Sequence, residues 1–250
     1  MEQAAKIKLK RAGKQLRDSQ PNGSSPARRP ASARLPGRLM TRSFFEAPPE
    51  LVAPRLLGKL LVSVTSAGPI VGRIVEVEAY LGPHNTPPDP AAHTYRGPTP
   101  RNLVIFGPAG HAYVYSIYGK YFCMNVSCEK AGQAGCLLIR ALEPVGDFSF
   151  AQMAKNRGLA PNAHVRQIAS GPSRLCLALG LTRPAHNGLD LLDPASPLQL
   201  RDDGLMVTEA AITARIGIKH AVDWPLRFVL PGHACASGPR SLVGRCVFVR

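Results

Sequence analysis

The sequence has no apolar run of the roughly 18–20 residues that a membrane-spanning helix needs. Its charged N-terminus is not followed by an apolar core, so it lacks the pattern of a secretory signal. It also has no P-loop, and its Gly-rich segment 107–110 lacks the spacing of a phosphate cradle. We therefore expect a soluble, intracellular protein that has no membrane contact and uses no nucleotide cofactor.

Metal-binding and disulfide patterns are missing as well. The six cysteines form no C-x-x-C pair and have no His at metal-binding spacing. Their neighbours are mostly apolar, which favours buried free thiols over zinc sites or disulfides. We expect no metal and no cofactor.

Acidic residues are scarce, with 16 Asp and Glu against 31 Lys and Arg, and the net charge is +15. Such a field concentrates polyanions, nucleic acid among them. Residues 1–40 carry +8 of this charge and residues 41–250 carry +7. The first segment is rich in Pro, Gly, Ser and Arg and poor in large apolar residues, so we predict a basic disordered tail over 1–40 and one folded domain over 41–250. The tail is either a solvated leader or a sequence-independent contact to phosphates, and the sequence favours neither.

Short apolar runs separated by turn signals predict six strands, over residues 59–65, 69–80, 111–118, 121–127, 136–144 and 226–230. Three helices are predicted: 50–58 ended by Gly58, 147–158 capped by Asp147, and 170–180 opened by Ser170 and Pro172 and ended by Gly180. Several strands follow each other through short links. This favours antiparallel pairing and an α+β fold.

All six tyrosines fall between residues 80 and 121. Stacked aromatic faces hold nucleobases at roughly 1–3 kcal/mol per base. Glu76, Glu78 and His93, which can move protons, lie in or beside the same stretch. The function is predicted to reside here.

Strict alternation along strand 69–80 sorts its side chains into two faces. One face takes Val75, Val77 and Ala79, and the other takes Ile74, Glu76, Glu78 and Tyr80. Two carboxylates and a ring on one surface suit catalysis, but a strand with an ordinary solvated face, its acids paired to Arg73 or Arg140, has the same pattern. From the pattern alone the solvated face is favoured.

Residues 111–127 read as a hairpin whose tip is Tyr118, Gly119 and Lys120. A tip normally carries small polar residues, so Tyr118 suits insertion between bases, with Lys120 on a phosphate. Tyrosines are also strong strand formers that pack across a strand pair, and we interpret Tyr113 and Tyr121 in this way, whereas such packing does not account for Tyr118.

His93 follows a Pro-rich segment and is placed on a loop, where a lone His is usually a plain surface residue. Arg101, in the segment TPRN, and Arg174 offer further donors for phosphates.

Read together, the segments RIVEVEAYLGP, AAH, TPRN, YVYSIYGKYFCMNVS, LLIRALEP and SGPSRLCLALG resemble the alkyladenine (3-methylpurine) DNA glycosylase family over residues 43–230. The resemblance implies a single compact mixed α/β (α+β) domain around a curved antiparallel sheet, with a protruding β-hairpin that enters the DNA minor groove.

The resemblance also assigns roles. It makes Glu78 the general base and Tyr118 the wedge that replaces the flipped nucleotide. It places Arg140 beside Glu78 and the water that Glu78 activates, and Ile216 at a position whose backbone carbonyl helps hold that water. The residues implied around the extruded base are Tyr80, His93, Tyr115 and Asn125, the last disfavouring the 2-amino group of guanine.

These assignments imply a monofunctional DNA glycosylase for alkylated or deaminated purines in base excision repair. The expected partner is double-stranded DNA with a damaged purine, bound by a monomer, in the cytoplasm or nucleoid of a bacterium or the nucleus of a eukaryote. Two alternatives remain: a non-catalytic nucleic-acid-binding module and a hydrolase of free nucleosides.

Overall fold

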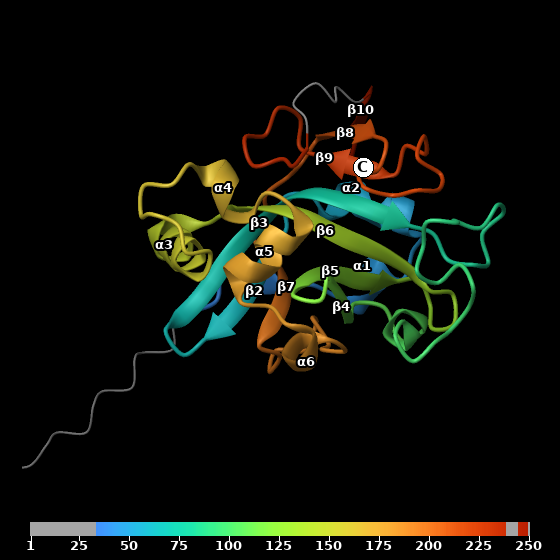
Figure 1. Ribbon diagram of the computed structural model, residues 1–250, viewed down its shortest axis with the longest axis horizontal. Coiled ribbons are helices and arrows are strands. Elements are labelled where there is room, and N and C mark those ends of the chain that lie inside the picture. The colour runs from blue at the N-terminus through green and yellow to red at the C-terminus, as the bar shows by residue number, and fades with distance from the viewer. Residues whose placement is uncertain (1–33, 239–244, 250) are drawn as a thin grey trace, which may run out of the picture. The chain divides into compact units, whose positions relative to one another are not determined.

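The computed structural model describes residues 34–238 and 245–249, which form a mixed α+β domain around one large antiparallel sheet (Figure 1). The order of the main strand path is β1-β7-β2-β3-β6-β5-β4, and β9 joins it by pairing with β3. β8 pairs with β9 and β10. The strands are β1 Arg38–Leu39, β2 Leu60–Thr65, β3 Gly68–Tyr80, β4 Ala112–Ile117, β5 Tyr121–Cys128, β6 Gly135–Pro144, β7 Leu198–Asp202, β8 Glu209–Thr213, β9 Arg227–Val229 and β10 Arg245–Phe248.

Short helices cover the sheet, and in Figure 1 α5 lies in front of β3 and β6 while α2 lies behind them. Their apolar side chains join those of the sheet in one large core cluster. The helical segments are α1 Arg42–Phe45, α2 Pro49–Leu56, the 3-10 turn η1 Leu103–Phe106, α3 Gly146–Asn156, α4 Val165–Ala169, α5 Pro172–Leu179 and α6 Arg183–His186.

The six predicted strands and three predicted helices are confirmed, but two helix starts differ. Val145 is the N-cap of α3, so Asp147 lies inside the first turn and does not cap it. The N-cap of α5 is Gly171 at φ 116°, a backbone conformation that favours glycine. The hydroxyl of Ser170 donates instead to the carbonyl of Ala236, a partner distant in sequence.

A β-bulge in β3 changes the predicted faces of that strand. The register with β6 shifts on both sides of Glu76. Ile74 therefore packs in the main core with Val77 and Ala79, whereas Val75 packs with Ala141 and Cys235 in a separate cluster. A bulge inserts one extra residue and so reverses the alternation on one side of it. The faces predicted for Ile74 and Val75 were therefore wrong. Glu76, Glu78 and Tyr80 do follow the predicted alternation.

The solvated face was also a wrong interpretation for this strand, because Glu76 and Glu78 are both fully buried. The ion pair with Arg140 that belonged to that interpretation is present, whereas Arg73 pairs with Asp203.

Residues 1–33 lie outside the described part of the chain, and with them most of the predicted tail. Within residues 34–40, Arg38–Leu39 form β1 on β7, so sheet structure begins before residue 41. Five cysteines are buried free thiols, as predicted, and the side chain of Cys246 lies outside the description. Among the described residues, no helix is both long enough and apolar enough to cross a bilayer.

Candidate active site

A cavity of about 650 Å³ opens between the β4–β5 hairpin, the end of β3, the start of α5 and two loops. Its volume lies within the roughly 300–1,000 Å³ of small-molecule sites. Five predicted site residues line it: Tyr80, His93, Tyr115, Asn125 and Arg140. Ile216 and Tyr118 line it as well, so one cavity collects residues from positions 80 to 216.

Glu78 is buried behind three residues that line this cavity, and we call the position of Glu78 and Arg140 the cavity floor. Its Oε1 accepts hydrogen bonds from the backbone N–H of Ile216 at 2.7 Å and pairs with Arg140 Nη1 at 3.1 Å. Its Oε2 accepts from the Tyr80 hydroxyl at 2.9 Å. This donor set suits an ionised carboxylate. The contact of Ile216 is made through its amide, whereas its predicted role concerned its carbonyl.

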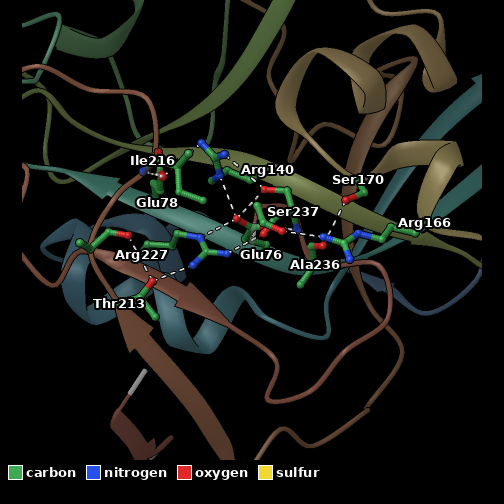
Figure 2. A network of polar contacts seen from close by, with 12 residues as sticks. Glu76, Glu78, Arg140, Arg166, Ser170, Thr213, Ile216, Arg227, Ala236 and Ser237 are labelled. Atoms are coloured by element: carbon green, nitrogen blue, oxygen red, sulfur yellow. Dashed lines mark hydrogen bonds and ion pairs between the residues drawn. The ribbon is translucent and has the colours of Figure 1, made fainter. Parts of the chain in front are cut away.

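Glu76 is held differently, although it is two residues away and equally buried. Its Oε1 accepts from Arg140 Nε at 2.9 Å, Arg227 Nε at 2.6 Å and the Ser237 hydroxyl at 2.8 Å. Its Oε2 accepts from the Ser237 backbone N–H at 2.6 Å. Figure 2 shows Glu76 in the centre of this network and Glu78 at its edge. Four donors leave Glu76 little capacity to take a proton from water.

A buried ion pair packs against the ring of Tyr80. Arg215 and Asp89 form a two-bond fork in which both side chains are fully buried, with Nη2 to Oδ1 at 2.9 Å. The Arg215 guanidinium also lies 4.5 Å from the centre of the Tyr80 ring and donates to the carbonyl of Ala79 at 3.0 Å. Asp89 accepts from the backbone N–H groups of Leu81 and Ala91, so the pair fixes the Pro-rich loop to the end of β3.

One wall of the cavity is aromatic. The rings of Tyr113 and Tyr115 stack at 5.5 Å, and His93 meets Tyr115 edge to face at 4.6 Å. His93 Nδ1 lies 3.0 Å from the hydroxyl of Tyr113, so the loop histidine does have a partner. Its partial removal from water lowers the pKa of His93, and the charge of Arg101 lowers this pKa further. The imidazole is therefore favoured in its neutral form.

Asn125 lies at the back of the cavity with both ends of its amide engaged. Nδ2 donates to the carbonyl of Tyr113 at 3.3 Å, across the β4–β5 pair. Oδ1 accepts from the thiol of Cys136 at 3.8 Å. Burial raises the pKa of Cys136 to about 12, which keeps this thiol protonated as a donor. These two contacts fix the orientation of the amide.

The hairpin tip contrasts with the rest of the site. Tyr118 is 90% exposed, and φ is 50° at Tyr118 and 73° at Gly119. A positive φ is unfavourable for a bulky residue and usual for glycine. Next to it, Lys120 Nζ lies 5.3 Å from the ring centre of Tyr121. The tip thus presents a ring and a cation to solvent.

The two other predicted phosphate contacts lie near the cavity but not in it. Arg101 places its guanidinium 5.6 Å from the ring centre of Tyr115. Arg174 is exposed in the first turn of α5. Partial burial lowers the pKa of Arg157, and the charge of Arg174 lowers this pKa further. The structure therefore gathers the cations Arg101, Lys120, Arg157 and Arg174 around the cavity and the hairpin.

Sequence reasoning missed several parts of the site. Asp89 and Arg215 were not singled out, and neither were the residues after Ile216, of which Gly217, Ile218, Lys219 and His220 line the cavity. Tyr113 was interpreted only as a packing residue, although its shared face with Tyr115 pointed to the wall. An acid inside an otherwise proline-rich loop was the available signal for Asp89.

Within residues 34–238 and 245–249, no group of three or more His, Cys, Asp or Glu is arranged to hold a metal ion.

The cavity and its surroundings point to an enzyme that works on single bases of a polyanion, because a buried carboxylate lies behind an aromatic cavity in a strongly basic chain.

Comparison with known proteins agrees with that class. Residues 43–234 match the family described as Methylpurine-DNA glycosylase (MPG). The relatives include proteins named "Putative 3-methyladenine DNA glycosylase" from Koribacter versatilis, at 48% identity over 81% of this chain and 95% of the relative, and from Rhodopseudomonas palustris, at 47% over 81% and 90%. One of the same name from Burkholderia lata is 42% identical over 82% of this chain and 94% of the relative.

The chain belongs to the methylpurine-DNA glycosylase family. It is accordingly a DNA-3-methyladenine glycosylase by family, acting in the base excision repair of alkylated purines. The predicted family, enzyme class and α+β fold are confirmed.

Proposed function

We propose that this chain flips alkylated or deaminated purines out of duplex DNA and hydrolyses their N-glycosidic bond with a water molecule that Glu78 activates. The observation that carries the proposal is the position of Glu78: its carboxylate accepts hydrogen bonds from Tyr80 and Ile216 and forms an ion pair with Arg140, and all three of these residues line the aromatic cavity. A base inside a duplex cannot be attacked, so a cavity of this kind needs an extruded nucleotide.

In the proposed reaction the oxygen of water bonds to C1′ of the deoxyribose as the bond from C1′ to the purine nitrogen breaks. The bonding electron pair leaves with the base, and Glu78 takes the proton of the water. The negative charge of Glu78 also stabilises the developing oxocarbenium character. The backbone N–H of Ile216 donates to Oε1, and Arg140 pairs with the same oxygen, so the two hold the carboxylate in place. The carbonyl of Ile216 is proposed to bind the water.

Tyr80, His93 and Tyr115 are proposed to enclose the extruded base. A purine alkylated on a ring nitrogen is positively charged, and a cation between aromatic faces gains about 0.5–2 kcal/mol over a neutral base. Neutral His93 adds no repelling charge. Asn125, whose amide is fixed at both ends, is proposed to exclude the 2-amino group of guanine.

Tyr118 is proposed to enter the duplex in place of the flipped nucleotide, because its ring is exposed at a tip held in a conformation unusual for tyrosine. Lys120, Arg101 and Arg174 are proposed to contact phosphates of a double-stranded DNA substrate, to which the protein binds as a monomer. The site of action is then the compartment that holds the genome.

The two alternatives explain less of the geometry. A non-catalytic module gives no reason to bury Glu78 beneath the cavity, where a carboxylate repels phosphate. A hydrolase of free nucleosides has no use for the exposed Tyr118 at the hairpin tip.

The variant Glu78→Gln tests the proposal, because glutamine keeps the shape of the side chain but cannot accept the proton. We expect the single-turnover rate of base release to fall by about 10²–10⁴, while binding to a lesion duplex persists. Glu76→Gln should lower the rate much less, and Glu143→Gln, on the partly exposed end of β6, is the matched control. Near wild-type release by Glu78→Gln would refute the assignment.

A further inference from the structure

Arg140 spreads its guanidinium over three different partners. Nε donates to Glu76 at 2.9 Å, Nη1 pairs with Glu78 at 3.1 Å, and Nη2 donates to the hydroxyl of Ser237 at 3.2 Å. A planar guanidinium is fixed in orientation by two hydrogen bonds to different groups. Glu76 and Ser237 therefore determine where the third nitrogen meets Glu78 (Figure 2).

The balance of buried charges also indicates that Glu76 is needed to hold Arg140 in place. Burial alone would lower the pKa of Arg140, but the neighbouring carboxylates Glu78 and Glu76 raise it above its usual value. The buried cluster contains Glu76, Glu78, Arg140 and Arg227, that is, two negative and two positive groups. Without Glu76, two buried cations would face only Glu78, and removing one partner of such a cluster leaves an uncompensated charge.

Ser237 uses every polar atom it has within this cluster. Its N–H and hydroxyl donate to Glu76, and its carbonyl accepts from Arg227 Nη2 at 2.9 Å. Arg227 in turn donates to the hydroxyl of Thr213 at 2.7 Å. A residue so fully engaged at a carboxylate is a fixed part of the cluster.

The segment 235–238 that carries Ser237 is itself attached to the helices near the cavity. The Ser170 hydroxyl donates to the carbonyl of Ala236 at 3.2 Å, and Arg166 Nη2 donates to the carbonyl of Gly238 at 2.6 Å. The N–H of Gly171, next to Ser170, donates to the carbonyl of Arg140 at 2.9 Å. Ser237 lies beyond residue 234, where the match to the family ends.

We propose that Glu76 and Ser237 are positioning residues of the reaction, and that segment 235–238 holds the guanidinium of Arg140 against Glu78. The proposal rests on the proposed role of Glu78. It assigns the two buried glutamates of β3 different tasks, proton transfer for Glu78 and orientation of Arg140 for Glu76.

The test compares Ser237→Ala with Ser196→Ala in the full chain. Both serines are 8% exposed, and each alanine removes a hydroxyl that takes part in two hydrogen bonds. The hydroxyl of Ser196, however, bonds only to the backbone of Leu198. We expect Ser237→Ala to release ethenoadenine from a duplex at least about fivefold more slowly than Ser196→Ala in single turnover. Affinity for the lesion duplex and the fluorescence change on flipping should stay within about twofold, which a general loss of structure would not allow.

A second arm places Ser237→Ala in an Arg140→Lys background, where the three-way fork is already lost. If Ser237 acts through Arg140, the added change should lower the rate by less than about twofold. The proposal is overturned if Ser237→Ala stays within about fivefold of Ser196→Ala, if rate and affinity fall together, or if the full loss persists in the Arg140→Lys background. Should Ser237→Ala not fold, Glu76→Gln replaces it in every measurement with the same thresholds.

Glu78→Gln is measured in parallel to separate the two claims. An inactive Glu78→Gln beside a fully active Ser237→Ala refutes the positioning proposal alone. An active Glu78→Gln refutes the proposed function itself.

Discussion

The cavity floor and the hairpin tip hold their functional side chains in different ways. At the floor, Glu78 and Arg140 are almost completely buried, and each is fixed by several hydrogen bonds. At the tip, Tyr118 is exposed, and its neighbour Lys120 contacts a single ring. Groups that act on a reacting atom need a fixed position, whereas groups that enter DNA must meet a partner that is absent from the free protein. The comparison predicts that floor variants affect stability and rate and that tip variants affect flipping.

The largest expected effect concerns the buried fork between Arg215 and Asp89 beneath Tyr80. Asp89→Asn keeps the shape but leaves the Arg215 charge without a counter-ion, which should lower the free energy of unfolding by about 3–5 kcal/mol. The matched control is Asp203→Asn, which removes a similar two-bond pair with Arg73 at the surface and should cost less than about 1 kcal/mol. Denaturant unfolding of both variants measures this difference. Equal losses would show that burial does not distinguish the two pairs.

An intermediate effect is expected at the tip. Tyr118→Ala removes the ring that we propose takes the place of the flipped nucleotide, so the flipping equilibrium should fall by about tenfold while thermal stability stays unchanged. The fluorescence change of an ethenoadenine duplex reports this equilibrium. The control is Tyr95→Ala, which removes another partly exposed ring from the loop that carries His93. Tyr113→Phe is not suitable, because the hydroxyl of Tyr113 contacts His93. An unchanged flipping constant for Tyr118→Ala would leave this ring without a role in DNA.

The smallest expected effect is a change in selectivity at Asn125. Serine is smaller and cannot span both the Tyr113 carbonyl and the Cys136 thiol, so a guanine-type base should enter more easily. We expect Asn125→Ser to raise the ratio of single-turnover rates on guanine-containing and ethenoadenine-containing duplexes by about threefold to tenfold. A ratio equal to that of the wild type would limit Asn125 to holding the two arms of the hairpin together.

Much of the site was predictable where local pattern and motif carried it. The alternation of β4 and β5 placed Tyr113 with Tyr115 and Cys123 with Asn125, and the cavity contains all four side chains. His93 could not be judged by pattern, because it lies on a loop and its partners Tyr113 and Tyr115 come from strand β4. The same limit applied to Arg215, whose counter-ion Asp89 is 126 residues away.

The sequence by itself determined the strands, the hairpin with a tyrosine at its tip, the excess of positive charge and the family motifs, because each depends on residues close together in the chain or on composition. Only the tertiary structure decided that β3 contains a bulge, that both of its glutamates are buried, and that their donors differ. Glu76 receives its hydrogen bonds from Arg140, Arg227 and Ser237, which lie 64, 151 and 161 residues further along. Periodicity describes one strand at a time, whereas the burial and hydrogen bonding of a carboxylate depend on which distant segments fold against it.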